Sequence, residues 1–373
     1  MLAAACDDGR APLGTPTSTA LPGTPSPTPG ASSVEQRVPI QPGVMGPPID
    51  LDATMLVTVY EGIGSEQPPA RIERIRINQQ GIVERTTALD ASDFMPGAYI
   101  NSWRNVAHPA AGSGGEVIVA LCHGGQCGGM GNADDDAKTT LTRTTDNGQT
   151  WETLATLDGA YWVVAWRADP TEVLLFDYPT ASEPATPLRF VRWPSLQAVD
   201  PPATSSGTTL EQQWPVLLAD GRVGWWWSDG RLLDDTGAAV LDLPGAGEPS
   251  AQPIEILPSP DGERLIVTWA AGGIQGQRWY WTLFEQQTSG RYEPQRTISR
   301  PTEISHAVPY SWLDDDRVIV PVTVPGTALG LPAETRVGYV PAVLDFASGE
   351  IRPFAVFAAP DVVGRGNLVV GIN

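Results

Sequence analysis

Residues Thr144–Trp151 read TTDNGQTW, and this stretch decides the fold that we predict. The Asp146 carboxylate is placed to accept backbone N–H groups across a tight turn. Gly148 supplies the positive φ that a tight hairpin requires. Trp151 then stands at the start of the next strand, where its large ring packs between neighbouring layers. The stretch therefore predicts a hairpin between two strands of a layered β protein.

The same eight residues match, position by position, the Asp-box of sialidase-like (BNR) β-propellers, Ser/Thr-x-Asp-x-Gly-x-Thr-Trp. The chain therefore resembles that superfamily. In its members the box lies on outer hairpins, away from the substrate. The resemblance implies a structural and not a catalytic role for the four residues that define the box, which are Thr144, Asp146, Gly148 and Trp151.

Weaker turns of this kind follow along the chain. Asp235–Gly237 carries the Asp-x-Gly core of the box, and Pro258–Gly262 resembles the Ser-Pro-Asp-Gly turn of TolB-like and WD-type propellers. Leu344–Glu350 resembles the blade-closing turn of the same group. Asp146 and Asp235 are 89 positions apart, about two repeats of ~45 residues, the size of a four-stranded blade.

The composition changes near residue 50, which divides the chain into residues 1–49 and residues 50–373. The second part contains short runs of Val, Ile, Leu, Trp and Tyr separated by Gly, Asp, Pro and Asn, and no sustained helical period. The run Trp225–Trp227 is apolar on both faces of a strand, as expected where blades are stacked on both sides. We predict an all-β fold, a single β-propeller of about seven four-stranded blades; six or eight blades also fit the length.

Charge and composition exclude several classes of protein. The chain contains 39 glycines and 36 prolines, and this high content argues against a helical bundle. The net charge of -20 disfavours binding to nucleic acid and to anionic lipid headgroups. No apolar run approaches the ~20 residues that span a bilayer.

The first residues, MLAAACDD, resemble the cleavage and lipidation site of a bacterial lipoprotein, with Cys6 as the lipidated residue. An apolar signal segment is expected upstream of Met1. Residues 11–33 are rich in Pro, Thr, Ser and Gly and form a disordered, extended linker. We therefore expect an extracytoplasmic protein of the cell envelope, on the outer face of the cytoplasmic membrane or secreted, that contacts the membrane only through a lipid anchor. An ordinary free cysteine in a disordered tail is the alternative.

Cys122 and Cys127 remain as an even pair, in the sequence CHGGQC. Two glycines between them allow a loop that brings the sulfurs together, and an oxidised pair fits an extracytoplasmic location. We favour a disulfide. Free thiols, or a metal site that includes His123, are the alternatives, although zinc requires about four ligands.

The clustered carboxylates Asp134, Asp135 and Asp136 could hold calcium, which takes oxygen ligands. Consecutive Asp side chains point in different directions, so a solvated turn is the favoured interpretation, and the same holds for Asp314–Asp316. No other cofactor is expected.

Aromatic side chains offer an apolar face with a polar edge, as sugar-binding surfaces do. Most of the 13 Trp belong to the core of a propeller. The residues that we select as candidates to line a channel or rim groove are Trp193, Trp214, Trp279 and Tyr310.

No catalytic signature is recognisable. The early Phe/Tyr-Arg-Ile-Pro motif of sialidases is absent, and the nearest string, Phe190–Pro194, has the wrong order. G-x-S-x-G, P-loop and H-E-x-x-H motifs are also missing. We predict a monomeric, non-catalytic protein that binds a glycan, a peptide or a partner protein of the envelope. An exo-sialidase-like glycoside hydrolase or another polysaccharide-active enzyme is the alternative, and a purely structural envelope protein is a third. The final strand, Asn367–Val370, either closes the ring or forms a truncated edge.

Overall fold

The structure of the chain is a computed structural model. It describes residues 38–49, 52–59, 70–78, 81–105, 115–127, 132–167, 171–180, 182, 189–202, 214–218, 221–226, 231–242, 251–272, 278–302, 309, 311–322, 340–354 and 367–372. The chain divides into two units, Met1–Gln36 and Arg37–Asn373. The first unit, with Cys6 and the linker, lies outside the described residues, so everything below concerns the second unit.

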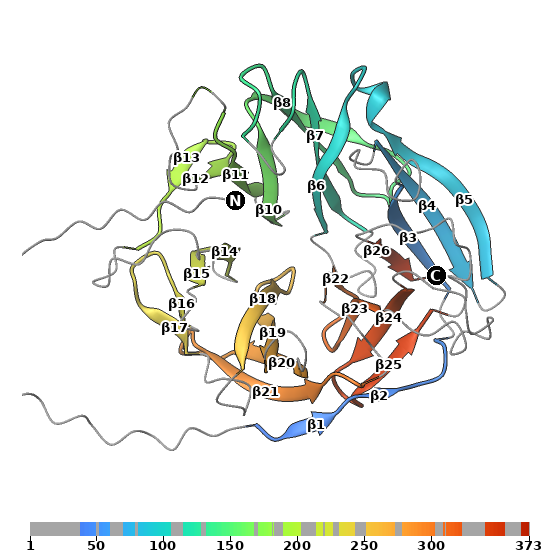
Figure 1. Cartoon of the computed structure of the whole chain (residues 1–373), viewed down its shortest axis with the longest axis vertical. Helices are drawn as coiled ribbons and strands as arrows, with labels where there is room; N and C mark the ends of the chain where they lie inside the picture. The colour runs from blue at the N-terminus through green and yellow to red at the C-terminus, as the bar shows by residue number, and fades with distance from the viewer. Residues whose placement is uncertain are drawn as a thin grey trace, which may run out of the picture. The chain divides into compact units, whose positions relative to one another are not determined.

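Six sheets of this unit form the blades of a propeller, arranged around a common centre (Figure 1). We number the blades in chain order. Blade 1 contains β3 (Ala53–Val59), β4 (Arg71–Asn78), β5 (Gly81–Asp90) and β26 (Asn367–Ile372). Blade 2 contains β6 (Tyr99–Asn105), β7 (Val117–His123), β8 (Lys138–Thr144) and β9 (Glu152–Asp158), after the short 3-10 helix η1 (Ala91–Asp93). Blade 3 contains β10 (Tyr161–Arg167), β11 (Glu172–Asp177), β12 (Arg189–Trp193) and β13 (Gln197–Val199).

The remaining three blades follow in the same order. Blade 4 contains β14 (Trp214–Leu217), β15 (Val223–Trp226), β16 (Arg231–Leu233) and β17 (Ala239–Asp242). Blade 5 contains β18 (Gln252–Pro258), β19 (Arg264–Ala271), β20 (Arg278–Gln286), β21 (Tyr292–Ser299) and β1 (Ile40–Pro42). Blade 6 contains β22 (Ser311–Trp312), β23 (Arg317–Val322), β24 (Val340–Asp345), β25 (Glu350–Pro353) and β2 (Val44–Met45).

The all-β propeller prediction is confirmed, and the described sheets number six, one of the alternative counts and not the favoured seven. The expected repeat of ~45 residues was too short. Long connections enlarge several repeats; the link between β23 and β24, for example, covers residues 323–339. Blades 5 and 6 also use fifth strands that come from outside their own repeats.

The last strand closes the ring. β26 pairs antiparallel with β3, with Leu368 opposite Leu56 and Ile372 opposite Ala53. It becomes the innermost strand of a blade whose other three strands come from the start of the ring (Figure 1). Of the two alternatives for the C-terminal strand, the structure therefore shows the one in which this strand closes the ring.

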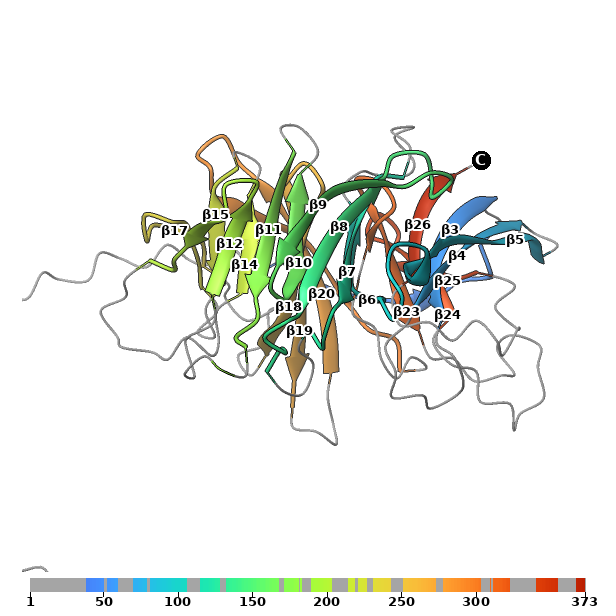
Figure 2. The same cartoon turned by 90° about the horizontal axis from the view of Figure 1, so that it is seen from above.

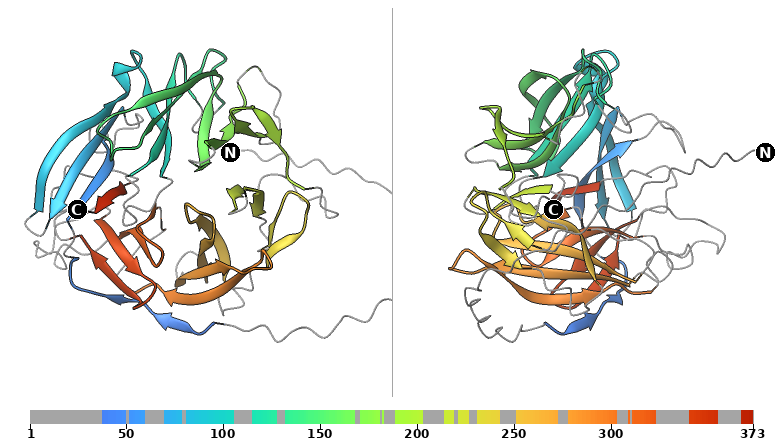
Figure 3. Two further views of the ribbon diagram at one scale, coloured as in Figure 1. Left: turned by 180° about the vertical axis from the view of Figure 1, so that it is seen from behind. Right: turned by 60° about the vertical axis from the view of Figure 1, so that its left-hand side comes forward.

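Residues 38–49, which the sequence assigned to the linker, run along the outside of blades 5 and 6 (Figure 3). β1 pairs parallel with β21, and β2 pairs parallel with β25. Backbone N–H groups of Gly43 and Val44 donate to the carbonyls of Ser299 and Gly349 at 2.9 and 3.0 Å. These pairings depend on backbone groups, which is why composition did not reveal the two strands.

The core lies between the stacked blades. All seven residues of Val117–His123 are buried, as expected for a strand covered on both faces. Trp225, Trp269, Trp281 and Trp312 are at most 1% exposed. No helix of the described residues is long and apolar enough to cross a membrane.

Candidate ligand face around the Cys122–Cys127 disulfide

The two ends of the blades differ in their connections. At one end, here called the turn face, the first strand of a blade joins the second and the third joins the fourth. At the other end, the loop face, the second strand joins the third and each blade joins the next (Figure 2). Turn-face connections are mostly short, such as residues 259–263 and 313–316, whereas loop-face connections include residues 124–137 and 178–188. Longer connections on a rigid scaffold are where binding residues concentrate.

The TTDNGQTW stretch forms a tight turn between β8 and β9, on the turn face. Asp146 Oδ1 accepts the backbone N–H groups of Gln149 and Thr150 at 3.0 and 2.8 Å. Thr144 Oγ1 accepts the N–H of Gly148 at 3.0 Å. Burial raises the pKa of Asp146, but the hydrogen bonds from Thr150, Thr144 and Gln149 outweigh it and hold the pKa below its ordinary value. The Asp146 carboxylate is fully engaged in its own turn.

A second turn of this type uses a different carboxylate from the one we expected. Asp234, and not Asp235, accepts the N–H groups of Thr236 and Ala238, both at 3.0 Å. Asp235 is exposed. The sequence pattern predicted the turn glycine correctly, because Gly237 has φ +84°. It selected the wrong carboxylate, because Asp234 lies inside the turn and pairs with Arg222.

Other turn-face carboxylates have similar local roles. Asp261 Oδ1 accepts the N–H of Glu263 at 3.0 Å, and Asp345 Oδ1 accepts that of Ala347 at 2.7 Å. Asp314 accepts the N–H of Arg317 at 2.9 Å, so this member of the second Asp triplet serves its own turn.

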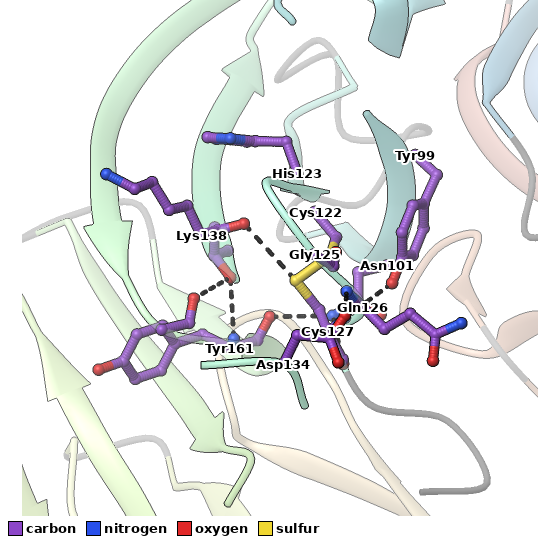
Figure 4. The surroundings of a disulfide bond; sticks show 12 residues. Tyr99, Asn101, Cys122, His123, Gly125, Gln126, Cys127, Asp134, Lys138 and Tyr161 are labelled. Carbon is purple, nitrogen blue, oxygen red and sulfur yellow. Dashed lines mark hydrogen bonds between the residues drawn. A yellow bond between two sulfur atoms is a disulfide. The ribbon is translucent and has the colours of Figure 1, made fainter. Parts of the chain in front are cut away.

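On the loop face, the structure contains a Cys122–Cys127 disulfide, and both cysteines are fully buried. Three side chains from the innermost strands bind the peptide groups of Cys127, and two of them, Tyr99 and Asn101, are labelled in Figure 4. The Cys127 N–H donates to the hydroxyl oxygen of Tyr99 at 2.8 Å. The Cys127 carbonyl accepts from Trp162 Nε1 at 3.3 Å and from Asn101 Nδ2 at 3.5 Å. The disulfide loop is therefore fixed to both β6 and β10.

The loops of blades 2 and 3 are joined into one surface. Ala133 forms a parallel bridge with Thr180, and its N–H donates to the Pro179 carbonyl at 3.0 Å. Ser182 Oγ donates to Asp135 Oδ1 at 2.6 Å. The loop after β7 and the loop after β11 thus hold each other in place.

Three aromatic rings gather at this junction. Tyr99, Trp162 and Tyr178 are each half-buried. The rings of Trp162 and Tyr178 have centroids 4.9 Å apart and are tilted by 49°. Tyr99 and Tyr178 pack against the small buried cluster that contains both cysteines. We call Tyr99, Trp162 and Tyr178 the aromatic trio.

The Tyr99 phenol stays protonated. Burial is the main cause that raises its pKa; the Cys127 N–H opposes it and the charge of Asp134 adds to it. The Tyr99 oxygen accepts the Cys127 N–H, and its O–H is a further donor that has no acceptor among the hydrogen bonds of the described residues.

Two of the three carboxylates of Asp134–Asp136 accept hydrogen bonds from neighbouring loop residues. Asp134 Oδ2 accepts the Gln126 N–H at 2.8 Å, and Asp135 accepts from Ser182. Within the described ranges, no group of three or more His, Cys, Asp and Glu side chains is arranged to hold a metal ion. Calcium binding therefore stays a prediction without geometric support.

His123 points into the sheet and is 3% exposed. Its Nε2 lies 2.9 Å from Thr140 Oγ1, and its Nδ1 has no hydrogen-bond partner among the residues described. Burial, and then the charge of Lys138, lower its pKa, so the ring is neutral at pH 7. A metal site of His123 with the two cysteines is incompatible with the disulfide.

The aromatic residues selected from the sequence are dispersed. Trp193 is half-buried at the turn face, at the end of β12. Trp279 is on the loop face but only 9% exposed, with the Arg300 guanidinium 5.7 Å above its ring. Trp214 begins β14, but its side chain lies outside the described parts, and so does Tyr310. The aromatic trio was missed, although Tyr99 begins β6 and Trp162 is the second residue of β10, the inner strands on either side of the CHGGQC loop.

No known protein family matches this chain. No curated protein matches it either. Its fold is similar to that of a periplasmic gluconolactonase from Pseudomonas aeruginosa, with 14% identity, 81% of each chain covered and a TM-score of 0.40. It is also similar to an oligogalacturonate lyase from Vibrio parahaemolyticus, with 9% identity, 85% of this chain and 86% of that chain covered, and a TM-score of 0.38.

Proposed function

We propose that this chain is an extracytoplasmic six-bladed propeller that binds a glycan on its loop face through the aromatic trio. The observation that carries the proposal is the gathering of three half-buried rings from two blades around one fixed peptide group. Such rings present apolar faces to sugar C–H groups, while neighbouring polar groups select among hydroxyls. The exposed Gln126 side chain and the Tyr99 O–H are the polar groups at hand.

The charge of the region supports a neutral or cationic glycan over a polyuronate. Asp134, Asp135 and Asp136 are exposed, and no basic side chain among the described residues pairs with them. Lys138 is paired with Asp158 at 3.1 Å. A negative surface opposes the approach of an anionic polymer, most strongly at low salt.

An extracytoplasmic location is part of the proposal. The disulfide is of the kind that persists in oxidising compartments. Cys6 is the proposed lipid-bearing residue, with residues 11–33 as the tether between the anchor and the ring. Mass spectrometry of the protein from its native membrane tests this, because an acylated Cys6 supports the anchor and an unmodified Cys6 refutes it.

The test of ligand binding is a glycan array probed with the full chain carrying Cys6→Ser, which prevents lipidation. Trp162→Leu should abolish the signal, whereas Trp193→Leu, an equally half-buried tryptophan on the turn face, should retain it. A signal unchanged by Trp162→Leu would place the site elsewhere, and no signal on any neutral, cationic or anionic glycan would refute glycan binding. The same array run with and without calcium tests the metal prediction.

The competing function, hydrolysis or elimination on a polysaccharide, is tested in the same samples. A glycoside hydrolase that uses a pair of carboxylates needs them to converge, and on this face Asp134 and Asp135 are hydrogen-bonded to Gln126 and Ser182. Release of reducing ends or unsaturated products from a glycan that binds would replace the binding proposal with an enzymatic one.

A further inference from the structure

The backbone N–H and carbonyl of Cys127 form hydrogen bonds with two side chains of the aromatic trio. They are Tyr99 and Trp162, which come from different blades. Asn101 joins the same hub, because its Nδ2 reaches both the Cys127 carbonyl and the Tyr161 carbonyl, the latter at 3.3 Å. The position of these groups relative to one another therefore depends on where Cys127 is held.

Cys127 follows Gln126, whose peptide groups are bonded to Asp134, but the segment that leads to it from β7 begins with two glycines. The paired part of β7 ends at His123, and Gly124 and Gly125 follow, with Gly124 at φ +81°. Glycines have the largest conformational freedom of any residue, so a loop that begins with two of them is intrinsically loose. The disulfide replaces this freedom by a link to Cys122, which is itself fixed in the ladder between Tyr99 and Thr139.

The ring itself does not depend on that link. Blade 2 is paired over its full width through β6, β7, β8 and β9. Its strand β7 is in register with β8 from Val117 to His123, so only the last two paired residues belong to the loop that the disulfide closes. Opening the disulfide therefore removes a constraint on the loop face and leaves the ladder of the blade in place.

We propose that the Cys122–Cys127 disulfide is a positioning clamp for the aromatic trio, so that the oxidation state of this pair controls ligand binding at the loop face. This inference rests on the proposed function for its consequence, but the positioning itself does not require a ligand. In the reduced state Cys127 no longer holds Tyr99 and Trp162 in a fixed arrangement, and the ligand must order them at its own entropic cost.

The redox step is an ordinary thiol–disulfide exchange. A thiolate of an external dithiol attacks one sulfur of the pair, breaking the S–S bond and forming a mixed disulfide. The second thiol of the reductant then displaces the remaining cysteine. The protein gains two thiols, and the dithiol is oxidised to its cyclic disulfide. Because both sulfurs are buried, exchange follows a local opening of the Gly124–Gln126 segment.

The first experiment measures positioning without any ligand. Hydrogen exchange of the Trp162 indole N–H is followed by NMR on 15N-tryptophan-labelled full chain, with the resonance assigned by Trp162→Phe. We expect at least tenfold faster exchange after reduction with dithiothreitol, and the same increase in the variant Cys122→Ala/Cys127→Ala. Asp146→Ala is the matched control, since it weakens a turn-face turn and leaves the loop face untouched. Equal exchange in oxidised, reduced and double-alanine protein overturns the clamp.

The second experiment measures the consequence. The strongest hit of the glycan array is titrated against oxidised and reduced chain and against the double-alanine variant. We expect at least tenfold weaker binding without the disulfide, while the thermal midpoint of the ring changes far less than in Asp146→Ala. Unchanged affinity overturns control by the disulfide even if binding itself is real. Absence of any array hit refutes the proposed function, while the exchange experiment still decides whether the disulfide positions Trp162.

Discussion

Substitution of Gly148 by alanine tests the physical account of the TTDNGQTW turn. Gly148 has φ +77°, where an L side chain costs about 1–2 kcal/mol. A Cβ added there would lie 2.6 Å from Leu56 Cδ2, a fully buried side chain of the neighbouring blade 1. Overpacking of this kind costs a further ~1–3 kcal/mol, because Leu56 is enclosed and its surroundings must move. We expect Gly148→Ala to lower the free energy of unfolding by about 2–5 kcal/mol.

Gly237 is the matched control for this substitution. It occupies an equivalent turn of blade 4 with φ +84°, but its added Cβ would meet nothing nearer than Pro202 Cβ at 3.5 Å, an ordinary contact. Gly237→Ala should therefore cost only the backbone term of about 1–2 kcal/mol. The difference between the two variants isolates the inter-blade contact with Leu56.

Guanidinium unfolding of the full chain, followed by tryptophan fluorescence, measures both values. In the background Leu56→Ala the space beside Gly148 is open, so the extra penalty of Gly148→Ala should largely disappear. Equal destabilisation by Gly148→Ala and Gly237→Ala would refute the reasoning, because the turn of blade 2 would then not be packed against blade 1.

Three further predictions concern the turns, the N-terminal strands and the cysteines. The folded state lowers the pKa values of Asp146 and Asp234 below their ordinary value of 3.8. The two ionised carboxylates therefore stabilise the fold fully above pH 3.8, and this stabilisation is lost as the pH falls through the lowered pKa values. The free energy of unfolding, measured from pH 5 to pH 2, should fall less in Asp146→Asn/Asp234→Asn than in the wild type. Gly43→Val should release β1 and β2, because its Cβ would collide with the Ser299 carbonyl oxygen. Proteolysis within residues 38–49 should then become fast. The control Val44→Ser, at a position that is 55% exposed, should leave cleavage slow. Peptide mapping without reductant should recover Cys122 and Cys127 in one crosslinked peptide, and two alkylated free thiols would contradict the disulfide.

The fold was predictable because a propeller is built from local signals. The turn at Asp146–Gly148 depends on hydrogen bonds between residues at most four positions apart, so its chemistry is visible in the sequence. The burial of Val117–His123 on both faces likewise follows from an uninterrupted apolar run. The number of blades was not predictable in this way, because connection lengths vary and the fifth strands of blades 5 and 6 come from residues 40–45.

The candidate site was much harder to predict because its contacts are not local. Trp162 lies 35 positions from Cys127, whose carbonyl it binds, and Cys127 lies 28 positions from Tyr99. In sequence, Trp162 and Tyr178 look like core residues of any strand. Only the pairing of β10 with β11 and the contact between the two rings show that they meet at one junction. Trp193, chosen for its aromatic ring alone, belongs to the opposite face.

The position of this junction in the ring has a physical consequence. The ring is closed where β26 pairs with β3 in blade 1, and β1 and β2 cover the outside of blades 5 and 6. The aromatic trio belongs to blades 2 and 3, whose strands all come from one continuous segment, residues 99–199. Fraying at the closure or detachment of β1 and β2 therefore opens hydrogen bonds in other blades before it reaches the loops around Cys127. The disulfide, in contrast, acts within blade 2 itself, which is why its removal should change the loop face while changes at Gly43 should not.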